Sequence, residues 1–196
     1  MKAVLCKQHG LPDTLVVEDV PSLVPAPGQV VVSMKAAGVN FPDALIIQGK
    51  YQVKPPFPFS PGTELAGVVK AVGEGVKHPK PGDAVIAYAG WGGFAEEVAV
   101  DARACIPLPH GVDFKVGASF MMTYGTSYHA LKDRAQLKAG ETLLVLGAAG
   151  GVGSAGGTFG GAGAGGYAPA NGGTLGAGGR GGGASIGILV VGTSSV

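Results

Sequence analysis

The stretch TLLVLGAAGGVG at 142–153 is the part of the chain whose residue pattern points most directly to chemistry. Its first five residues are apolar or β-branched and predict a strand buried on both faces. The turn that follows places Ala148, Gly150 and Gly153 at the spacing of a dinucleotide-binding fingerprint, with alanine in the first glycine position. Small residues there let the backbone turn tightly, approach a pyrophosphate and pack against the next helix. We therefore predict a cofactor-binding turn, with a plain tight turn as the alternative, formed by Ala148, Ala149, Gly150, Gly151, Val152 and Gly153.

The residues after this turn lack the composition of the helix that a dinucleotide site requires. Such a site needs helical N–H groups that face the pyrophosphate. Positions 154–168 hold seven glycines, which cost on the order of 7 kcal/mol in helix propensity relative to alanine, and Pro169 would end a helix. The acidic or basic residue that selects NAD or NADP about 20 positions on is also absent, since Arg180 is the only charged residue after Glu141.

Length and composition restrict the class of protein. The 196 residues suffice for one full domain and part of another. A net charge of +1 argues against nucleic acid and anionic membrane surfaces as partners. Cys6 and Cys105 lie far apart and fit a reduced protein without disulfides. No apolar run reaches the roughly 18 residues of a membrane span, and no signal-peptide core is present at the start. We therefore expect a cytoplasmic protein.

The first 110 residues or so have the pattern of short strands separated by turns. A short helix is expected over 42–48, and the four prolines of 54–61 predict an extended or turn-rich loop. The regular spacing of the short strands and turns suggests an antiparallel barrel or sandwich. The strands are expected at 3–5, 15–20, 30–36, 64–72, 84–88 and 94–100.

The pattern changes beyond these strands. Positions 114–132 have roughly helical spacing, and we expect Gly125 to divide them into two helices. From 154 onwards 17 of the last 43 residues are glycine, so this tail has little apolar area to offset its entropy of folding. The exception is IGILVV at 186–191, a predicted strand that could lie parallel beside 143–146.

Six short motifs follow one another in a fixed order along the first 153 residues. They are AGVNFPD at 37–43, PGTELAGVV at 61–69, VGEGV at 72–76, PGDAV at 81–85, GFAEE at 93–97 and GAAGGVG at 147–153. In these motifs the chain resembles the medium-chain dehydrogenase/reductase superfamily, and more narrowly its zinc-free quinone oxidoreductase (zeta-crystallin-like) branch. The resemblance covers residues 1 to about 153 and ends there.

The resemblance implies an α+β fold with a GroES-like antiparallel β-barrel, followed by the first strand and glycine turn of a truncated Rossmann α/β domain. The expected organisation has three parts. A catalytic barrel domain covers 1–125, a connecting helix and first Rossmann strand cover 126–153, and an atypical glycine-rich tail covers 154–196.

The resemblance also bears on metal binding. Zinc-dependent relatives place a cysteine where this chain has Asn40 or Phe41, and a histidine where it has Thr63. Asparagine and threonine are poor zinc ligands beside thiolate and imidazole. The four-cysteine structural lobe is also missing, because the chain has only two cysteines. We therefore expect no metal site.

Candidate site residues follow from the resemblance, each beside a structural alternative. Asn40 is expected at the nicotinamide, and the alternative is an asparagine that hydrogen-bonds its own turn. Thr126 is expected there too, with Tyr124 beside it, and the alternative is a hydroxyl group that kinks the helix. Tyr51 could stack over a quinone or be an exposed loop aromatic. Asp43 is expected to cap a helix rather than act as an acid, and Glu64 to be a buried structural acceptor. The predicted catalytic set is thus Asn40, Tyr51 and Thr126, with Asn40 and Thr126 also binding the cofactor.

Three functions compete. The first is an NADPH-dependent reductase of a small-molecule quinone or enone, for which the resemblance implies a homodimer. The second is an inactive truncated or frameshifted remnant, in which a folded barrel carries a flexible tail. The third is an interaction module that uses the strand edge at Leu143. Binding of NADPH at micromolar concentration distinguishes the first from the second.

Overall fold

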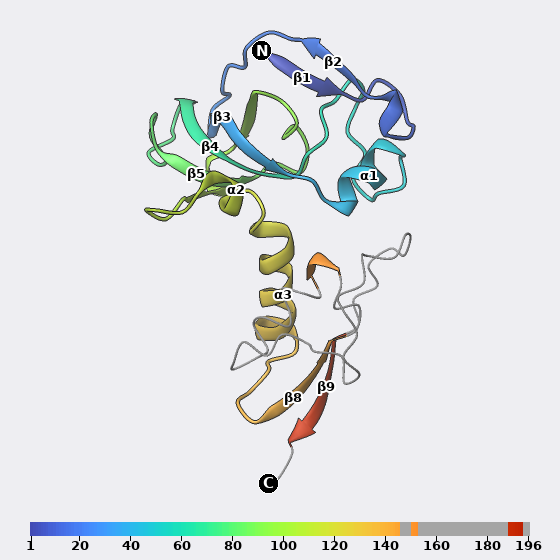
Figure 1. Cartoon of the computed structure of the whole chain (residues 1–196). Helices are drawn as coiled ribbons and strands as arrows, with labels where there is room; N and C mark the ends of the chain where they lie inside the picture. The colour runs from blue at the N-terminus through green and yellow to red at the C-terminus, as the bar shows by residue number, and fades with distance from the viewer. Residues whose placement is uncertain (146–149, 153–187, 194–196) are drawn as a thin grey trace. The chain divides into compact units, whose positions relative to one another are not determined.

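The computed structural model describes residues 1–145, 150–152 and 188–193 (Figure 1). The chain forms two compact units, Met1–Met121 and Met122–Val196. The boundaries expected at 125 and 153 stay predictions. Ala148, Ala149 and Gly153 of the predicted turn lie outside the described residues.

The first unit is built on a five-stranded sheet in which every neighbouring pair is antiparallel. Its order is β6-β3-β4-β5-β7. The strands are β3 (Gln29–Gly38), β4 (Glu64–Val72), β5 (Ala84–Tyr88), β6 (Glu97–Asp101) and β7 (Cys105–Pro107).

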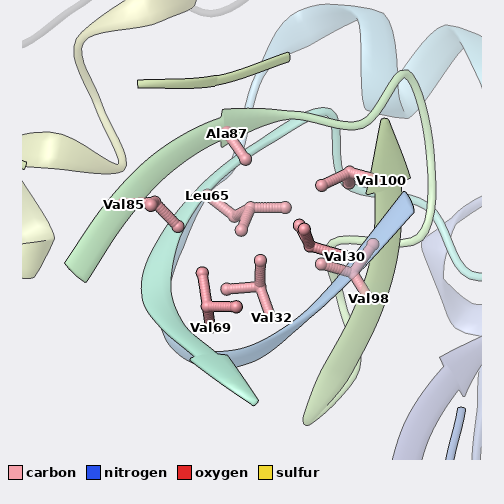
Figure 2. Packing of buried hydrophobic residues seen from close by; sticks show 8 residues of the cluster. All are labelled: Val30, Val32, Leu65, Val69, Val85, Ala87, Val98 and Val100. Carbon is pink, nitrogen blue, oxygen red and sulfur yellow. The ribbon is translucent and has the colours of Figure 1, made fainter. Parts of the chain in front are cut away.

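The expected antiparallel strands are present, but the expected barrel does not close, because this sheet is open. Its edge strands β6 and β7 do not pair with each other in the part of the chain that the structure describes. Strand β7 has only three residues and ends in Pro107, which has no N–H to donate to a further ladder. The sheet instead curls around its apolar face, as Figure 2 shows.

The apolar core of this unit lies on the inner face of the curled sheet. Side chains that alternate along β3, β4, β5 and β6 point towards one another there, as period-2 strands require (Figure 2). Each member is at most 4% exposed: Val30, Val32, Leu65, Val69, Val85, Ala87, Val98 and Val100.

A separate two-stranded antiparallel sheet precedes this one. It pairs β1 (Lys2–Leu5) with β2 (Val16–Asp19), and η1 (Pro12–Thr14) lies between them. Strand β1 is tied to the larger sheet region by a bridge between Ala3 and Ala95. These two strands confirm the predictions at 3–5 and 15–20.

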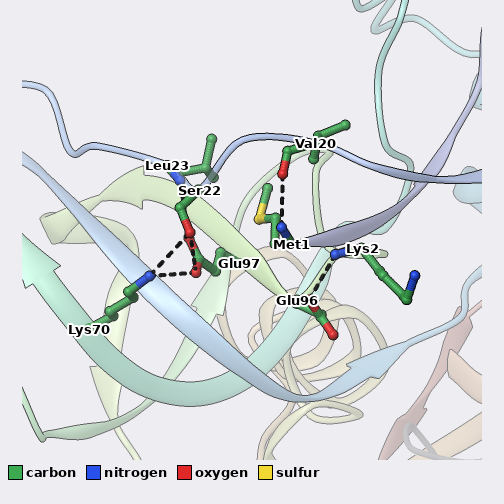
Figure 3. Close-up of polar contacts among 8 residues, drawn as sticks. All are labelled: Met1, Lys2, Val20, Ser22, Leu23, Lys70, Glu96 and Glu97. Atoms are coloured by element: carbon green, nitrogen blue, oxygen red, sulfur yellow. Dashed lines mark hydrogen bonds and ion pairs between the residues drawn. The ribbon is translucent and has the colours of Figure 1, made fainter.

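A buried carboxylate fastens the segment after β2 to the large sheet (Figure 3). Glu97 is 8% exposed and pairs with the Lys70 ammonium at 2.6 Å. Its carboxylate also accepts hydrogen bonds from the Ser22 hydroxyl at 3.1 Å and the Leu23 N–H at 3.0 Å. These donors, Lys70 foremost, lower the pKa of Glu97 below its ordinary 4.5.

Because the folded-state pKa of Glu97 is depressed, its contribution to stability is present above pH 4.5 and is lost as the pH falls through the folded-state pKa. Glu97→Gln is therefore expected to lower the free energy of unfolding at pH 7 by about 1 kcal/mol, and less at pH 3. Urea unfolding at both pH values measures this difference. The control is Glu18→Gln, which removes an exposed pair with Lys7 and should change little. Equal losses at the two pH values would contradict the prediction.

Short helices connect the strands. In the first unit these are α1 (Phe41–Ile47), η2 (Ala102–Ala104) and α2 (Phe114–Gly117). Strands 64–72 and 84–88 and the helix over 42–48 are confirmed to within a residue.

A second helical stretch runs through η3 (Met121–Gly125), α3 (Thr126–Tyr128) and η4 (His129–Arg134). The expected division at Gly125 is wrong, because this residue has helical φ and ψ angles of −59° and −45°. Glycine adopts this conformation at a cost of only about 1 kcal/mol relative to alanine. The interruption lies before Met121 instead.

Strand β8 (Glu141–Val145) pairs with β9 (Ile188–Thr193) in the second unit. The predicted tail strand exists, shifted by two residues, but the pairing is antiparallel and the expectation of a parallel neighbour is wrong. Parallel pairing needs a crossover connection, usually a helix, whereas antiparallel pairing needs only a reversal of the chain. No helix within the described ranges is long and apolar enough to cross a membrane.

Candidate functional site

The start of α1 positions the first two polar residues of the candidate site. Asn40 has extended backbone angles and precedes the helix, and Pro42 occupies its first turn. The Asn40 N–H donates to Asp43 Oδ2 at 2.7 Å, which confirms Asp43 as part of the helix cap. Asp43 is 3% exposed, so this carboxylate is fixed by the fold.

The Asn40 side chain reaches across to the start of β4. Its Nδ2 donates to Glu64 Oε1 at 2.9 Å, and Glu64 is 2% exposed. Glu64 is therefore the buried acceptor that the sequence predicts, and Asn40 contacts the start of β4 as well as its own helix cap. Gly38 makes room for this arrangement, since a Cβ there would overlap the Glu64 carboxylate.

Two buried polar atoms lie beside this hydrogen bond. Asp43 Oδ1 and Thr63 Oγ1 are buried and have no hydrogen-bond partner among the described residues. Burial raises the pKa of Asp43, and the Asn40 N–H, with Gly62 and Thr63 close by, partly offsets that effect. The site thus holds a carboxyl group whose charged form is disfavoured relative to a carboxyl group in water.

Tyr51 follows α1 and packs against a small apolar cluster. The cluster contains Cys6, Ile46, Ile47 and Phe59, each at most 4% exposed. Tyr51 is half-buried against it, so the alternative of an exposed loop aromatic is wrong. Stacking of this ring on a substrate stays a prediction.

Sequence reasoning missed Tyr88, the last residue of β5. It interacts electrostatically with both Tyr51 and Asp43, and its pKa is raised by burial first and by these two groups after it. The available signal was its position at the end of a predicted strand, opposite Glu64 of the neighbouring strand. Asn40, Asp43, Glu64, Tyr51 and Tyr88 therefore gather at one end of the first unit.

A glycine-rich loop holds the start of β4 in place. The N–H groups of Gly92, Gly93 and Phe94 donate to carbonyls of residues 60–62 at 2.7, 2.9 and 2.8 Å. Gly62 has a φ of +96°, and a Cβ there would lie 2.6 Å from the Phe94 ring. Glycine is needed for both reasons. The loop also carries Trp91, the only tryptophan of the chain.

The second unit contains residues 150–152 of the predicted cofactor-binding turn. Ser127 is fully buried, and its hydroxyl donates to the Val152 carbonyl at 2.7 Å. A Cβ at Gly151 would lie 2.9 Å from Thr123 Cγ2, so a small residue is required where the helix meets the turn. Ser127 and Thr123 were missed, although their spacing of four puts them on one helix face.

Thr126 lies in this second unit, on α3, with an exposed side chain. The structure thus brings Asn40 and Tyr51 into one unit and places Thr126, Gly150, Gly151 and Val152 in the other. Their roles stay predictions.

Nucleophilic and metal chemistry have little support in the residues that the structure describes. Burial raises the pKa of the Cys105 thiol to about 11, and that of Cys6 is raised too. Both thiols are therefore neutral near pH 7. Within the same ranges no group of three or more histidine, cysteine, aspartate or glutamate side chains is placed to hold a metal ion.

Comparisons with known proteins agree with this architecture. Residues 26–110 match the alcohol dehydrogenase GroES-like domain. A quinone oxidoreductase-like protein 2 homolog of Nematostella vectensis is 42% identical over 156 residues, which are 79% of this chain and 42% of that protein. Human quinone oxidoreductase is 40% identical over 157 residues, 79% of this chain and 48% of that protein.

The fold has solved relatives as well. The quinone oxidoreductase of Thermus thermophilus, solved also in complex with NADPH, superposes with a TM-score of 0.69 and 38% identity over 80% of this chain and 48% of that one. The present chain thus spans about half the length of the relatives that it matches. Over that length the chain is similar to quinone oxidoreductases, and its residues 26–110 match the alcohol dehydrogenase GroES-like domain.

Proposed function

We propose that residues 1–153 are the substrate-binding part of a zinc-free, NADPH-dependent reductase of a quinone or an enone. The observation that carries the proposal is the 2.9 Å hydrogen bond between Asn40 and Glu64. The resemblance places the zinc ligands of zinc-dependent relatives at Asn40 or Phe41 and at Thr63. Here the Asn40 amide is instead held by a buried carboxylate, and Tyr51 and Tyr88 lie at the same end of the first unit.

Zinc does not fit these residues. Neutral amide and hydroxyl groups, as in Asn40 and Thr63, are poor zinc ligands. The buried Glu64 already accepts a hydrogen bond from Asn40. We therefore derive no step through a metal.

Two contacts in the described part of the turn support a dinucleotide as the cofactor. Gly151 allows the helix at Thr123 to pack closely on this turn, and the buried Ser127 fixes the Val152 carbonyl. Quinone oxidoreductases of Thermus thermophilus and Escherichia coli have been solved with NADPH, which supports the same cofactor here. When bound, NADPH would supply a hydride. Asn40 and Thr126 would orient it, and Tyr51 would hold the substrate ring.

The second candidate is an inactive remnant, favoured by the antiparallel pairing of β8 with β9. A dinucleotide-binding domain is a mostly parallel sheet with helices on both faces, and a two-stranded antiparallel ladder does not supply its adenosine pocket. Each loss of about 1.4 kcal/mol of binding free energy from those contacts weakens NADPH binding tenfold. The homodimer and the cytoplasmic location stay predictions.

The first experiment assays the 196-residue chain alone for NADPH oxidation with 1,4-benzoquinone, after subtraction of the non-enzymatic rate. We expect no saturable turnover and only millimolar or undetectable NADPH binding. A chimera joins residues 1–153 to the remaining part of the Thermus thermophilus enzyme and is expected to reduce the quinone.

The controls separate the two candidates. The chimera's rate should not change with a metal chelator, and Asn40→Ala in the chimera should lower kcat/KM by about tenfold, as expected for loss of one orienting hydrogen bond. A folded chimera that binds NADPH but reduces no quinone would contradict the proposed function. Saturable turnover by the 196-residue chain itself would exclude the remnant.

A further inference from the structure

Tyr88 stands on the same face of the sheet as the Asn40–Glu64 hydrogen bond. The register of β4 and β5 sets Glu64 directly opposite Tyr88. Next to this pair, the Ala89 N–H donates to the Thr63 carbonyl at 2.8 Å. Side chains that are directly opposite in an antiparallel pair project from one face, so the phenol of Tyr88 lies at the polar end of the first unit.

The phenol of Tyr88 is protonated at physiological pH, and its surroundings favour the neutral form further. Burial raises the pKa of Tyr88 above its ordinary 10.0, and Tyr51 and Asp43 act in the same direction. These two neighbours come from α1 and the segment that follows it, so three elements meet at this point. A neutral tyrosine offers one O–H donor, and Tyr88 offers it throughout the physiological range of pH.

The fold itself does not use that donor. Among the residues that the structure describes, no acceptor receives a hydrogen bond from the Tyr88 hydroxyl, and the residue is 41% exposed. Glu64 and Asp43, by contrast, are almost fully buried and hydrogen-bonded. Tyr88 is thus partly accessible to a ligand from solvent.

We propose that Tyr88 is a substrate-binding residue that donates a hydrogen bond to the carbonyl oxygen of a planar quinone or enone, across from the ring of Tyr51. The inference rests on the function proposed above and adds a residue that determines specificity. Reduction places negative charge on that oxygen, and a pre-positioned O–H donor stabilises it. The apolar cluster behind Tyr51 provides a rigid surface for the substrate ring.

The test measures binding of duroquinone to the intact 196-residue chain, without cofactor. This quinone is fully methyl-substituted, which limits its addition to the two cysteines. Trp91 is the only tryptophan and lies three residues from Tyr88, so 5-fluorotryptophan gives one fluorine NMR signal that reports on the site. The variants are Tyr88→Phe, which removes only the hydroxyl, and the control Tyr128→Phe, an exposed tyrosine of the second unit.

Tyr88→Phe is expected to raise the Kd of duroquinone about 5-fold, with an unchanged urea-unfolding transition and no effect of Tyr128→Phe. Equal affinities for wild type and Tyr88→Phe would overturn the role of Tyr88 and leave the proposed function standing. Absence of any shift of the wild-type signal at millimolar duroquinone would contradict the proposed substrate class, and this inference with it.

Discussion

Replacing Gly62 with alanine is expected to lower the free energy of unfolding of the first unit by about 3 kcal/mol. A φ of +96° costs a residue with a Cβ about 1–2 kcal/mol. The new methyl group would also lie 2.6 Å from the Phe94 ring and 2.8 Å from the backbone of Gly93, which adds the cost of overpacking. Urea unfolding followed by the fluorescence of Trp91 measures the change.

The matched control is Gly75→Ala. Gly75 has a φ of +79°, but a Cβ there would meet nothing within 4 Å. It therefore carries the conformational cost without the steric one, and we expect a loss of about 1 kcal/mol. Equal losses for the two variants would show that the close approach between the loop and the start of β4 is unimportant. A larger loss of unfolding free energy for Gly62→Ala than for Gly75→Ala would show that close packing beside Thr63 and Glu64 stabilises the first unit.

The second large effect is expected for Leu65→Ala. Leu65 is fully buried in the core of the curled sheet (Figure 2). Removal of a buried leucine side chain loses transfer free energy and leaves a cavity, together about 3 kcal/mol. The same unfolding experiment measures this loss.

Leu11→Ala serves as the control for the same chemical change at the surface. Leu11 is 60% exposed, so its truncation should alter the free energy of unfolding by no more than about 0.5 kcal/mol. A small effect at Leu65 would mean that the cluster of Figure 2 is not the core of a cooperative unit.

Local pattern predicts most elements of the first unit. Strands 64–72 and 84–88 match β4 and β5 at both ends, because β-branched residues there are bounded by turn residues such as Gly73 and Pro81. Strand β7 was missed, since three residues with a proline at the end carry too little periodicity. The sequence also did not show that the predicted barrel stays open, because closure depends on whether the edge strands meet.

Some residues of the candidate site could likewise be predicted from the sequence, and others could not. Asn40, Asp43 and Glu64 stand out from their motifs, and the helix cap at Asp43 follows from the spacing of Asn40, Pro42 and Asp43. Tyr88 could not be predicted as a site residue, because it lies in none of the sequence motifs. Its importance comes from the register that places it opposite Glu64.

The sequence by itself therefore determined most of the strands, the cap of α1 and the turns, since each depends on residues within a few positions of one another. Only the tertiary structure decided that the Asn40 side chain reaches Glu64, that Tyr88 lies with Tyr51 and Asp43, and that β9 runs antiparallel to β8. These contacts join residues 24 or more positions apart. These contacts depend on strand register and on the space left by the missing side chain at Gly38. Neither can be predicted from the local periodicity of the sequence.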